Sequence, residues 1–233
     1  MPLPIVEVPK YSVIIPSTGE NVVYRPYLVK EEKILMIAME SENQEQVMRA
    51  VKEVIAACTF NKINVDSLTV FDMEYVFLKL RSKSVGEVSK IGVKCGECST
   101  LNDIEVQLDI LEVSKPEEDN SVVMITDKIG VKLRYPTVKD ANVLVKYSGT
   151  EAAMKTIIAC IDNIFDDEKV YPAGDSTPKE LEQFVDSLNS EQFKKMQKFF
   201  ETMPSLSHDA KFTCIKCGHQ NELLIKGLAN FFG

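Results

Sequence analysis

The spacing of apolar residues predicts a β-hairpin near the N-terminus and helices after it. Residues 12–16 (SVIIP) and 21–26 (NVVYRP) are β-prone runs on either side of a Gly-containing turn, which is the pattern of a hairpin. In residues 43–58, apolar side chains recur at helical spacing, and Asn43 precedes them as a candidate N-cap. We therefore expect the first part of the chain to form a hairpin followed by helices.

Further helices are expected in both parts of the chain. Residues 68–83 (LTVFDMEYVFLKLRSK) are apolar nearly all round, which indicates a central, buried helix. Thr177 and Glu180 form a capping-box pattern, with Pro178 at the first helical position. A similar capping pattern begins at Asn189 and precedes a second apolar stripe. The second part of the chain is therefore predicted to contain two successive helices before its last strand.

The order of elements repeats along the sequence. The pairs that match at an offset of 110 are Ile15 with Ile125, Val23 with Leu133, and Pro26 with Pro136. The run VKEVIAAC ending at Cys58 matches MKTIIAC ending at Cys160, and two C-x-x-C pairs lie 119 residues apart. Each half reads as hairpin, helix, helix ending in Cys, third helix, C-x-x-C and strand. Because these matches occur in one order, we infer a tandem duplication.

The duplication sets the predicted domain organisation and fold class. Residues 1–113 form the first repeat lobe, residues 114–121 (SKPEEDNS) are a linker, and residues 122–233 form the second lobe. Apolar residues alternate from Ile104 to Ile110 after the first C-x-x-C, whereas the run ELLIKG after the second is shorter. The fold class is α+β, predominantly helical, with small hairpins.

Composition and charge exclude several classes of protein. The chain has 233 residues, of which 45% are apolar and 27% charged, enough to bury a core. No apolar run approaches the roughly 18 to 20 residues of a membrane span, and the N-terminus lacks the pattern of a signal peptide. A net charge of −8 disfavours phosphate backbones. We expect neither a membrane nor nucleic acid as a partner.

Four cysteines form the candidate metal site. Cys95 with Cys98, and Cys214 with Cys217, are C-x-x-C pairs, a spacing that directs two thiolates toward one ion. Each half supplies only two of the four ligands that Zn²⁺ takes in a structural site. We therefore predict that the two zinc-knuckle hairpins meet and share one structural Zn²⁺. Gly218 follows the second pair where the chain can need a positive φ.

Other interpretations of the cysteines remain open at this stage. A thioredoxin-like redox pair would lie at the N-terminus of a helix, but neither pair precedes a helical pattern. His219 is a possible substitute ligand beside the four thiols. Cys58 and Cys160 occupy apolar helical faces and are expected to be small buried side chains rather than ligands.

The sequence contains no catalytic motif that we can identify. There is no G-x-S-x-G elbow, Walker loop, G-x-G-x-x-G or H-E-x-x-H. Residues 163–180 are rich in carboxylates, but such runs are usually solvated surface loops. A zinc ion enclosed by four cysteines also lacks the open coordination position that hydrolysis requires. We expect a protein that is not an enzyme.

Several segments together resemble a known family. They are YRPYLVKEEKILMIAME after the first hairpin, the C-G-E-C turn, and the ending C-I-K-C-G-H…L-L-I-K-G-L-A-N-F-F. This layout is similar to the baseplate hub proteins of T-even-like contractile-tailed bacteriophages, over nearly the whole chain. The C-terminal cysteine turn with its GL-x-x-FF ending is the most specific part of the resemblance.

The resemblance implies a non-enzymatic hub subunit or hub assembly factor. Its partners would be other baseplate hub or tail proteins, and its location the host cytoplasm during assembly and the virion tail baseplate. Phe231 and Phe232 at the C-terminus would pack on the zinc hairpin or insert into a partner. Two other functions remain open besides that of a hub protein. One is a zinc-ribbon adaptor that binds nucleic acid or the transcription apparatus, and the other is a thiol oxidoreductase.

Overall fold

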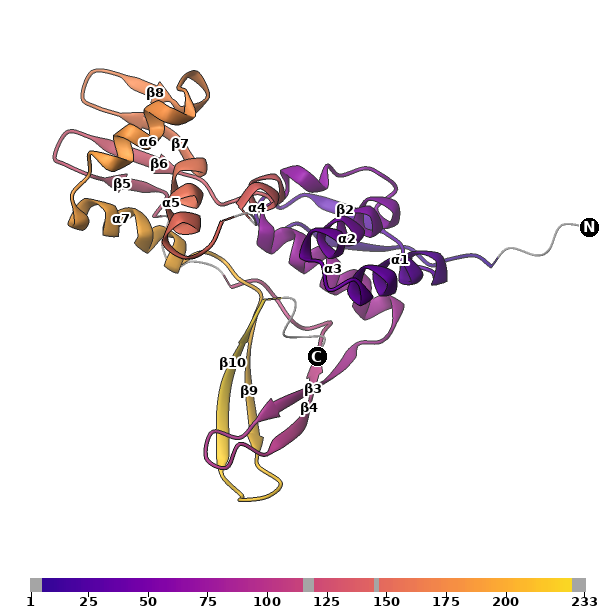
Figure 1. Cartoon of the computed structure of the whole chain (residues 1–233). Coiled ribbons are helices and arrows are strands. Elements are labelled where there is room, and N and C mark those ends of the chain that lie inside the picture. Colours follow the sequence, from indigo (N-terminus) through magenta and orange to yellow (C-terminus); the bar gives the residue numbers. More distant parts are fainter. Residues whose placement is uncertain (1–5, 115–119, 145–146, 228–233) are drawn as a thin grey trace, which may run out of the picture. The chain divides into compact units, whose positions relative to one another are not determined.

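The computed structural model describes residues 6–114, 120–144 and 147–227 and divides the chain into two compact units (Figure 1). Unit 1 combines Met1–Ser114 with Ser205–Gly233, and unit 2 is Lys115–Pro204. The two units are defined by contacts in space, whereas the predicted lobes are consecutive halves of the sequence. The two divisions therefore have different boundaries. The last hairpin, assigned by sequence to the second lobe, belongs to unit 1 because it packs against residues of the first segment.

Unit 1 begins with the predicted hairpin and three helices. Strands β1 (Tyr11–Ile14) and β2 (Asn21–Tyr24) pair antiparallel, and Gly19 in the turn has a φ of +72°. The helices are α1 (Val29–Glu40), α2 (Gln44–Cys58) and α3 (Val70–Ser84), with a short 3-10 helix at Val65–Ser67. As predicted, the Asn43 side chain caps α2 by accepting hydrogen bonds from two backbone N–H groups. Burial on several sides of α3 agrees with its predicted central position.

Two long hairpins form the remainder of unit 1. The first contains β3 (Val88–Lys94) and β4 (Leu101–Gln107), and the second contains β9 (Ser207–Thr213) and β10 (Gln220–Lys226). β4 and β10 both have seven residues, so the shorter second strand expected from sequence is not found. Figure 1 shows the two hairpins side by side, in magenta and yellow.

A small apolar core joins the two hairpins to α3. Its buried members are Leu78, Ile91, Val93, Val106, Leu108, Leu111, Leu206, Ala210 and Ile225. At the base of the hairpins, Val113 and Leu206 form an isolated antiparallel bridge. Segments about 100 residues apart in sequence therefore meet along this core.

Within its described residues, unit 2 has a four-stranded antiparallel sheet and four α-helices. Its strands, in sheet order, are β5 (Val122–Met124), β6 (Gly130–Leu133), β7 (Ile161–Phe165) and β8 (Val170–Pro172). Its helices are α4 (Val138–Leu144), α5 (Gly149–Ala159), α6 (Pro178–Asp186) and α7 (Ser190–Glu201), with a 3-10 helix at Ala173–Asp175. The capping boxes predicted at Thr177 and Asn189 start α6 and α7.

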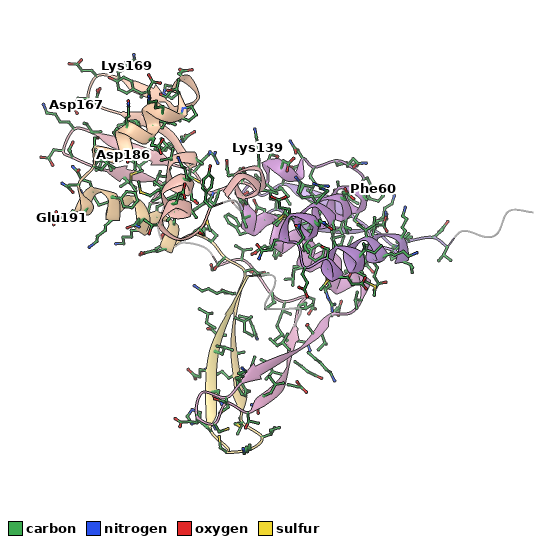
Figure 2. The ribbon with its side chains drawn as sticks, in the orientation of Figure 1. Phe60, Lys139, Asp167, Lys169, Asp186 and Glu191 are labelled. Carbon is green, nitrogen blue, oxygen red and sulfur yellow. The ribbon has the colours of Figure 1, made fainter. Side chains whose placement is uncertain are left out.

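The hairpin of β7 and β8 was not predicted, because its carboxylates pointed to a surface loop. The turn fits that description, since Asp167 and Lys169 are exposed and project from it (Figure 2). The strand β8 is also exposed, whereas β7 buries Ile161 and places the Phe165 ring over Gly130. An added Cβ on Gly130 would come within 2.2 Å of that ring, so a glycine is needed there. β7 and β8 also interrupt the order of elements that the two halves were predicted to share.

One buried apolar cluster of unit 2 includes residues of α7. It contains Val123, Ile125, Val131, Leu133, Ile157, Ile158, Ile161, Val185, Met196 and Phe199. The Phe199 ring stacks on Tyr135 at a centroid distance of 4.9 Å and meets Phe200 edge-on at 5.0 Å. The chain as a whole mixes helix and sheet, so the predicted α+β class is confirmed. Phe231 and Phe232 lie outside the described residues.

Candidate metal centre

The turn between β3 and β4 holds the first cysteine pair. The N–H of Cys95 donates to the carbonyl of Thr100 at 2.9 Å, and the N–H of Ser99 donates to the carbonyl of Cys95 at 3.0 Å. Ser99 has a φ of 56°, a conformation that non-glycine residues seldom adopt. This tight turn brings Cys95 and Cys98 to the same end of the hairpin.

The turn between β9 and β10 repeats this backbone pattern. The N–H of Cys214 donates to the carbonyl of His219 at 2.9 Å, and the N–H of Gly218 donates to the carbonyl of Cys214 at 3.0 Å. Gly218 has a φ of 73°, which confirms the positive φ predicted for it. Each of these positions lies 119 residues after its counterpart in the first turn. The two cysteine turns thus have matching backbone hydrogen bonds.

The four predicted cysteines come together in one cluster. The Sγ atoms of Cys95 and Cys217 are 3.7 Å apart, and those of Cys98 and Cys214 are 3.6 Å apart. All four sulfurs lie within 4.8 Å of one another. Each close pair contains one cysteine from each hairpin, so the cluster depends on both. His219 does not belong to the cluster, and only its backbone takes part in the turn.

Two asparagines connect the hairpins around the sulfurs. Asn102 of β4 accepts from the N–H of Ile215 at 2.9 Å and directs its Nδ2 toward Cys214 Sγ at 3.8 Å. Asn221 of β10 accepts from the N–H of Gly96 at 2.9 Å and directs its Nδ2 toward Cys95 Sγ at 3.6 Å. The two contacts are reciprocal. Such outer groups orient metal ligands and are part of a metal site's design.

The sequence analysis missed both asparagines, although a signal for them was present. Each lies four residues after the second cysteine of its pair, so both turns read C-x-x-C-x-x-x-N. An asparagine among the other polar and charged residues of a strand has no obvious role in a single sequence. Its partner is on the other hairpin, and only the fold reveals that contact.

Backbone hydrogen bonds change the acidity of the thiols. The N–H groups of Cys217 and Lys216 lower the pKa of Cys214 to about 6. The N–H of Cys98 is the largest of the influences that lower the pKa of Cys95. The N–H of His219 lowers the pKa of Cys217, but the neighbouring thiols outweigh it and raise the value to about 12. Four thiols at this distance therefore cannot all ionise without a cation between them.

The geometry of the sulfur cluster is compatible with zinc. A tetrahedral site with Zn–S bonds of about 2.3 Å has S···S edges of about 3.8 Å. The Cys98–Cys214 and Cys95–Cys217 separations, 3.6 and 3.7 Å, are close to that edge. The donor set, four thiols from two turns with N–H groups directed at them, is the chemistry of a closed structural site.

The other two cysteines are buried, as predicted, and do not belong to this cluster. Cys58 and Cys160 are both 0% exposed. Burial raises the pKa of Cys58 to about 11 and that of Cys160 to about 12. Each lies beside an arginine whose guanidinium pairs with a carboxylate, Arg25 in unit 1 and Arg134 in unit 2. Both thiols therefore remain protonated and are not candidate ligands.

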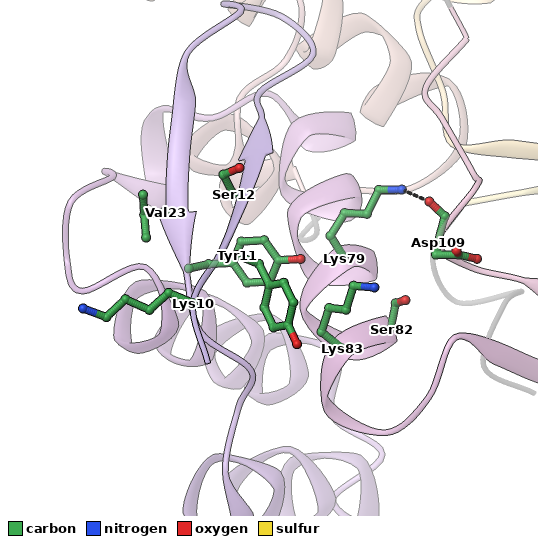
Figure 3. Close-up of a pocket in the computed structure, with 9 residues that line it drawn as sticks. Lys10, Tyr11, Ser12, Val23, Lys79, Ser82, Lys83 and Asp109 are labelled. Atoms are coloured by element: carbon green, nitrogen blue, oxygen red, sulfur yellow. Dashed lines mark hydrogen bonds between the residues drawn. The ribbon is translucent and has the colours of Figure 1, made fainter. Parts of the chain in front are cut away.

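Two surface hollows lie outside the cysteine cluster. One, of about 730 Å³, lies in unit 1 between the β1–β2 hairpin and α3 (Figure 3). There, Lys79 Nζ donates to the carbonyls of Asp109 at 2.5 Å and Leu111 at 3.1 Å, and burial lowers the pKa of Lys79. The other, of about 600 Å³, lies in unit 2 and contains the ion pair of Lys155 with Glu182. These charged groups have structural partners within the protein.

Comparisons with known proteins identify the family. None of the described helices combines the length and the apolar character needed to cross a bilayer. Searches among curated proteins and among solved structures found no match. A family model described as T4 bacteriophage base plate protein matches residues 8–233, nearly the whole chain, which confirms the resemblance seen in the sequence. The chain therefore belongs to the T4 bacteriophage base plate protein family.

Proposed function

We propose that this protein is a non-enzymatic subunit or assembly factor of the baseplate hub in a contractile-tailed phage. The family match over residues 8–233 supports a role in the baseplate. The observation that supports the non-enzymatic part is the cysteine cluster, whose four thiols are the number that a closed tetrahedral zinc site requires. A zinc ion held in this way has no open position for a substrate or water, so its contribution is structural.

The proposed Zn²⁺ is held by Cys95, Cys98, Cys214 and Cys217. It fastens the tips of two hairpins whose bases are separated in sequence by the whole of unit 2. Because a preformed site is absent from the unfolded chain, metal binding contributes directly to folding. In this proposal the ion fixes one hairpin against the other and presents a rigid surface to other baseplate hub or tail proteins.

We further infer that the chain arose by tandem duplication. In unit 1, the N–H of Arg25 donates to the carbonyl of Cys58 at 3.0 Å, and its guanidinium pairs with Glu31 at 2.9 Å. Unit 2 has the same arrangement around Arg134, whose N–H donates to the carbonyl of Cys160 at 2.8 Å.

The acidic partner in unit 2 also lies at the equivalent position. Arg134 pairs with Asp140 at 2.6 Å, and in each unit the carboxylate lies six residues after its arginine. These arginines are 109 residues apart, one fewer than the offset of the strand matches. The reciprocal asparagines add a further correspondence at an offset of 119. Together these contacts support two lobes, 1–113 and 122–233, that contribute one cysteine hairpin each.

The alternative function is a zinc-ribbon adaptor for nucleic acid, since paired cysteine hairpins also occur in such modules. The net charge of −8 argues against it, because binding to a phosphate backbone depends on clustered Lys and Arg. A gel-shift assay at low salt distinguishes the two functions. Tight DNA binding would favour the adaptor and would count against a hub protein.

Co-purification with tail proteins tests the proposed function. The tagged full-length protein is expressed during phage infection, and bound proteins are identified by mass spectrometry after chemical cross-linking. We expect hub or tail proteins to be enriched over a tag-only control. Cys98→Ser should reduce this enrichment, whereas Cys58→Ala, which leaves the cluster intact, should not. Absence of every tail protein from the wild-type sample would contradict the proposal.

A further inference from the structure

Helix α1 has an apolar face on the side opposite its buried face. Its buried residues, Glu31 and Ala38, are seven positions apart and lie on one stripe of the helix. The opposite stripe contains Val29, Met36 and Ile37, which are 79%, 57% and 61% exposed. A helix with apolar residues on both faces normally has contacts on both.

Two further exposed apolar side chains lie on the two flanks of the helix, between the exposed and the buried stripes. Ile34 is 40% exposed and Met39 is 63% exposed. Single exposed hydrophobic residues are ordinary, but five on one helix of 12 residues form a patch of the kind that marks an interaction site. We call the stripe made by Val29, Met36 and Ile37, together with Lys33 and Glu40 that lie between them, the outer face of α1.

The charges on the outer face are arranged for pairing with a copy of itself. If two α1 helices cross antiparallel with their midpoint between Met36 and Ile37, Met36 of one copy meets Ile37 of the other. Lys33 then meets Glu40 of the second copy. A two-fold interface is self-complementary in this way, because residue i contacts j and residue j contacts i. A parallel pair would instead place Lys33 against Lys33.

Both charged residues are available for such a contact. Lys33 and Glu40 are exposed, and within the part of the chain that the structure describes neither has an ion-pair partner. The adjacent Lys30 differs, because its Nζ pairs with Glu31 at 3.5 Å. The one lysine and one glutamate on the outer stripe are therefore the two that the antiparallel arrangement brings together.

We propose that the outer face of α1 is the interface of an antiparallel homodimer. The occupant is a second copy of this chain, since the charge pattern complements its own reversed sequence. One helix from each copy buries less area than a standard interface, so a weak dimer is expected, in the micromolar range. This inference goes beyond the proposed hub function and does not depend on it.

Sedimentation equilibrium of the zinc-loaded full-length chain tests the proposal. The range of about 1 to 200 μM covers a weak interface. Wild type is expected to dimerise, and Met36→Lys should weaken the dimer at least about tenfold, because a two-fold interface contains each substitution twice. Lys62→Glu, a charge reversal at an exposed loop position, should leave the dimer unchanged.

The charge swap makes the test specific to the antiparallel register. Lys33→Glu and Glu40→Lys should each weaken the dimer several-fold by placing like charges together. The double variant K33E/E40K should restore wild-type affinity, since it only reverses the two signs. A monomeric wild type, in which other chain segments or other proteins cover the face, would overturn the proposal. So would dimerisation that Met36→Lys leaves intact, or a double variant no tighter than the single ones.

Discussion

The two hairpins of unit 1 and the sheet of unit 2 reach stability in different ways. Unit 2 buries large side chains such as Phe199 and Met196 in one cluster that its own residues complete. The hairpins share a smaller core that includes Ala210 and Ile225, and their far ends contain the cysteines and exposed turn residues such as Ile215. Apolar burial can therefore hold unit 2, whereas the hairpin tips need the proposed metal.

Metal removal is expected to have the largest effect, because it should destabilise the hairpin tips of unit 1 and leave unit 2 stable. Chelation, or Cys214→Ser, should abolish zinc binding and remove a stabilisation of order 10 kcal/mol from the hairpin tips. Amide hydrogen exchange should then accelerate in β3, β4, β9 and β10 and stay slow in unit 2. Zinc should be present at one ion per chain in wild type and in Cys58→Ala. Unchanged exchange after complete zinc removal would rule out a structural role for the metal.

Truncation of a side chain in the unit 2 core should destabilise unit 2 and leave the hairpins of unit 1 unchanged. Phe199→Ala removes a ring that is 2% exposed and stacked on Tyr135, and should cost about 3 to 5 kcal/mol. Urea unfolding followed by hydrogen exchange should show the loss in unit 2 only. Zinc content should remain at the wild-type level. A cost below about 1 kcal/mol would mean that this core is less tightly packed than the structure indicates.

The asparagine contacts should have an intermediate effect. Asn102→Ala and Asn221→Ala each leave a backbone N–H of the other hairpin without its acceptor, at about 1 to 3 kcal/mol. Each should also weaken zinc binding about 10-fold to 100-fold, measured by competition with a chromogenic chelator. Gln107→Ala, at an exposed position on the same strand as Asn102, is the control. Markedly unequal effects of the two substitutions would argue against their equivalence.

The arginine networks should give the smallest effect, seen as a pH dependence. Burial raises the pKa of Asp140, but the guanidinium of Arg134 and the N–H of Thr137 outweigh it and lower the value. A depressed pKa stabilises the fold above the unfolded value of about 3.9, and this stability is lost as pH falls through the folded pKa. In wild type, the urea concentration at the unfolding midpoint of unit 2 should therefore decrease when the pH is lowered below about 4.

A matched substitution isolates this contribution. Asp140→Asn should be less stable at neutral pH and should lose the part of the acid dependence that comes from Asp140. Glu31→Gln should do the same in unit 1, since hydrogen bonds from Arg25 and Leu28 lower the pKa of Glu31 despite the opposing effect of burial. If Asp140→Asn keeps the full wild-type acid dependence, the Arg134 pair is not its source.

Local patterns in the sequence were enough to predict the α+β class, the first hairpin and the helix caps. Caps such as Asn43 and the positive φ of Gly218 depend on a few neighbouring residues, so the sequence by itself determines them. The strands β7 and β8 were missed for the same reason. Their carboxylates resemble a loop locally, whereas the hairpin is held by strand pairing with β6 and by packing of Phe165 over Gly130.

The sequence alone was enough to identify the four cysteines as candidate metal ligands and to predict that the two pairs meet. Tertiary structure decided that the last hairpin joins unit 1, and that Asn102 and Asn221 link the two turns. The two residues in each of these contacts are more than 100 positions apart in the sequence, so no local pattern indicates the contact. The physical reason is that helix periodicity and capping depend on residues close together in the sequence. The packing of one hairpin against another depends on which surfaces remain to be buried after each segment has folded.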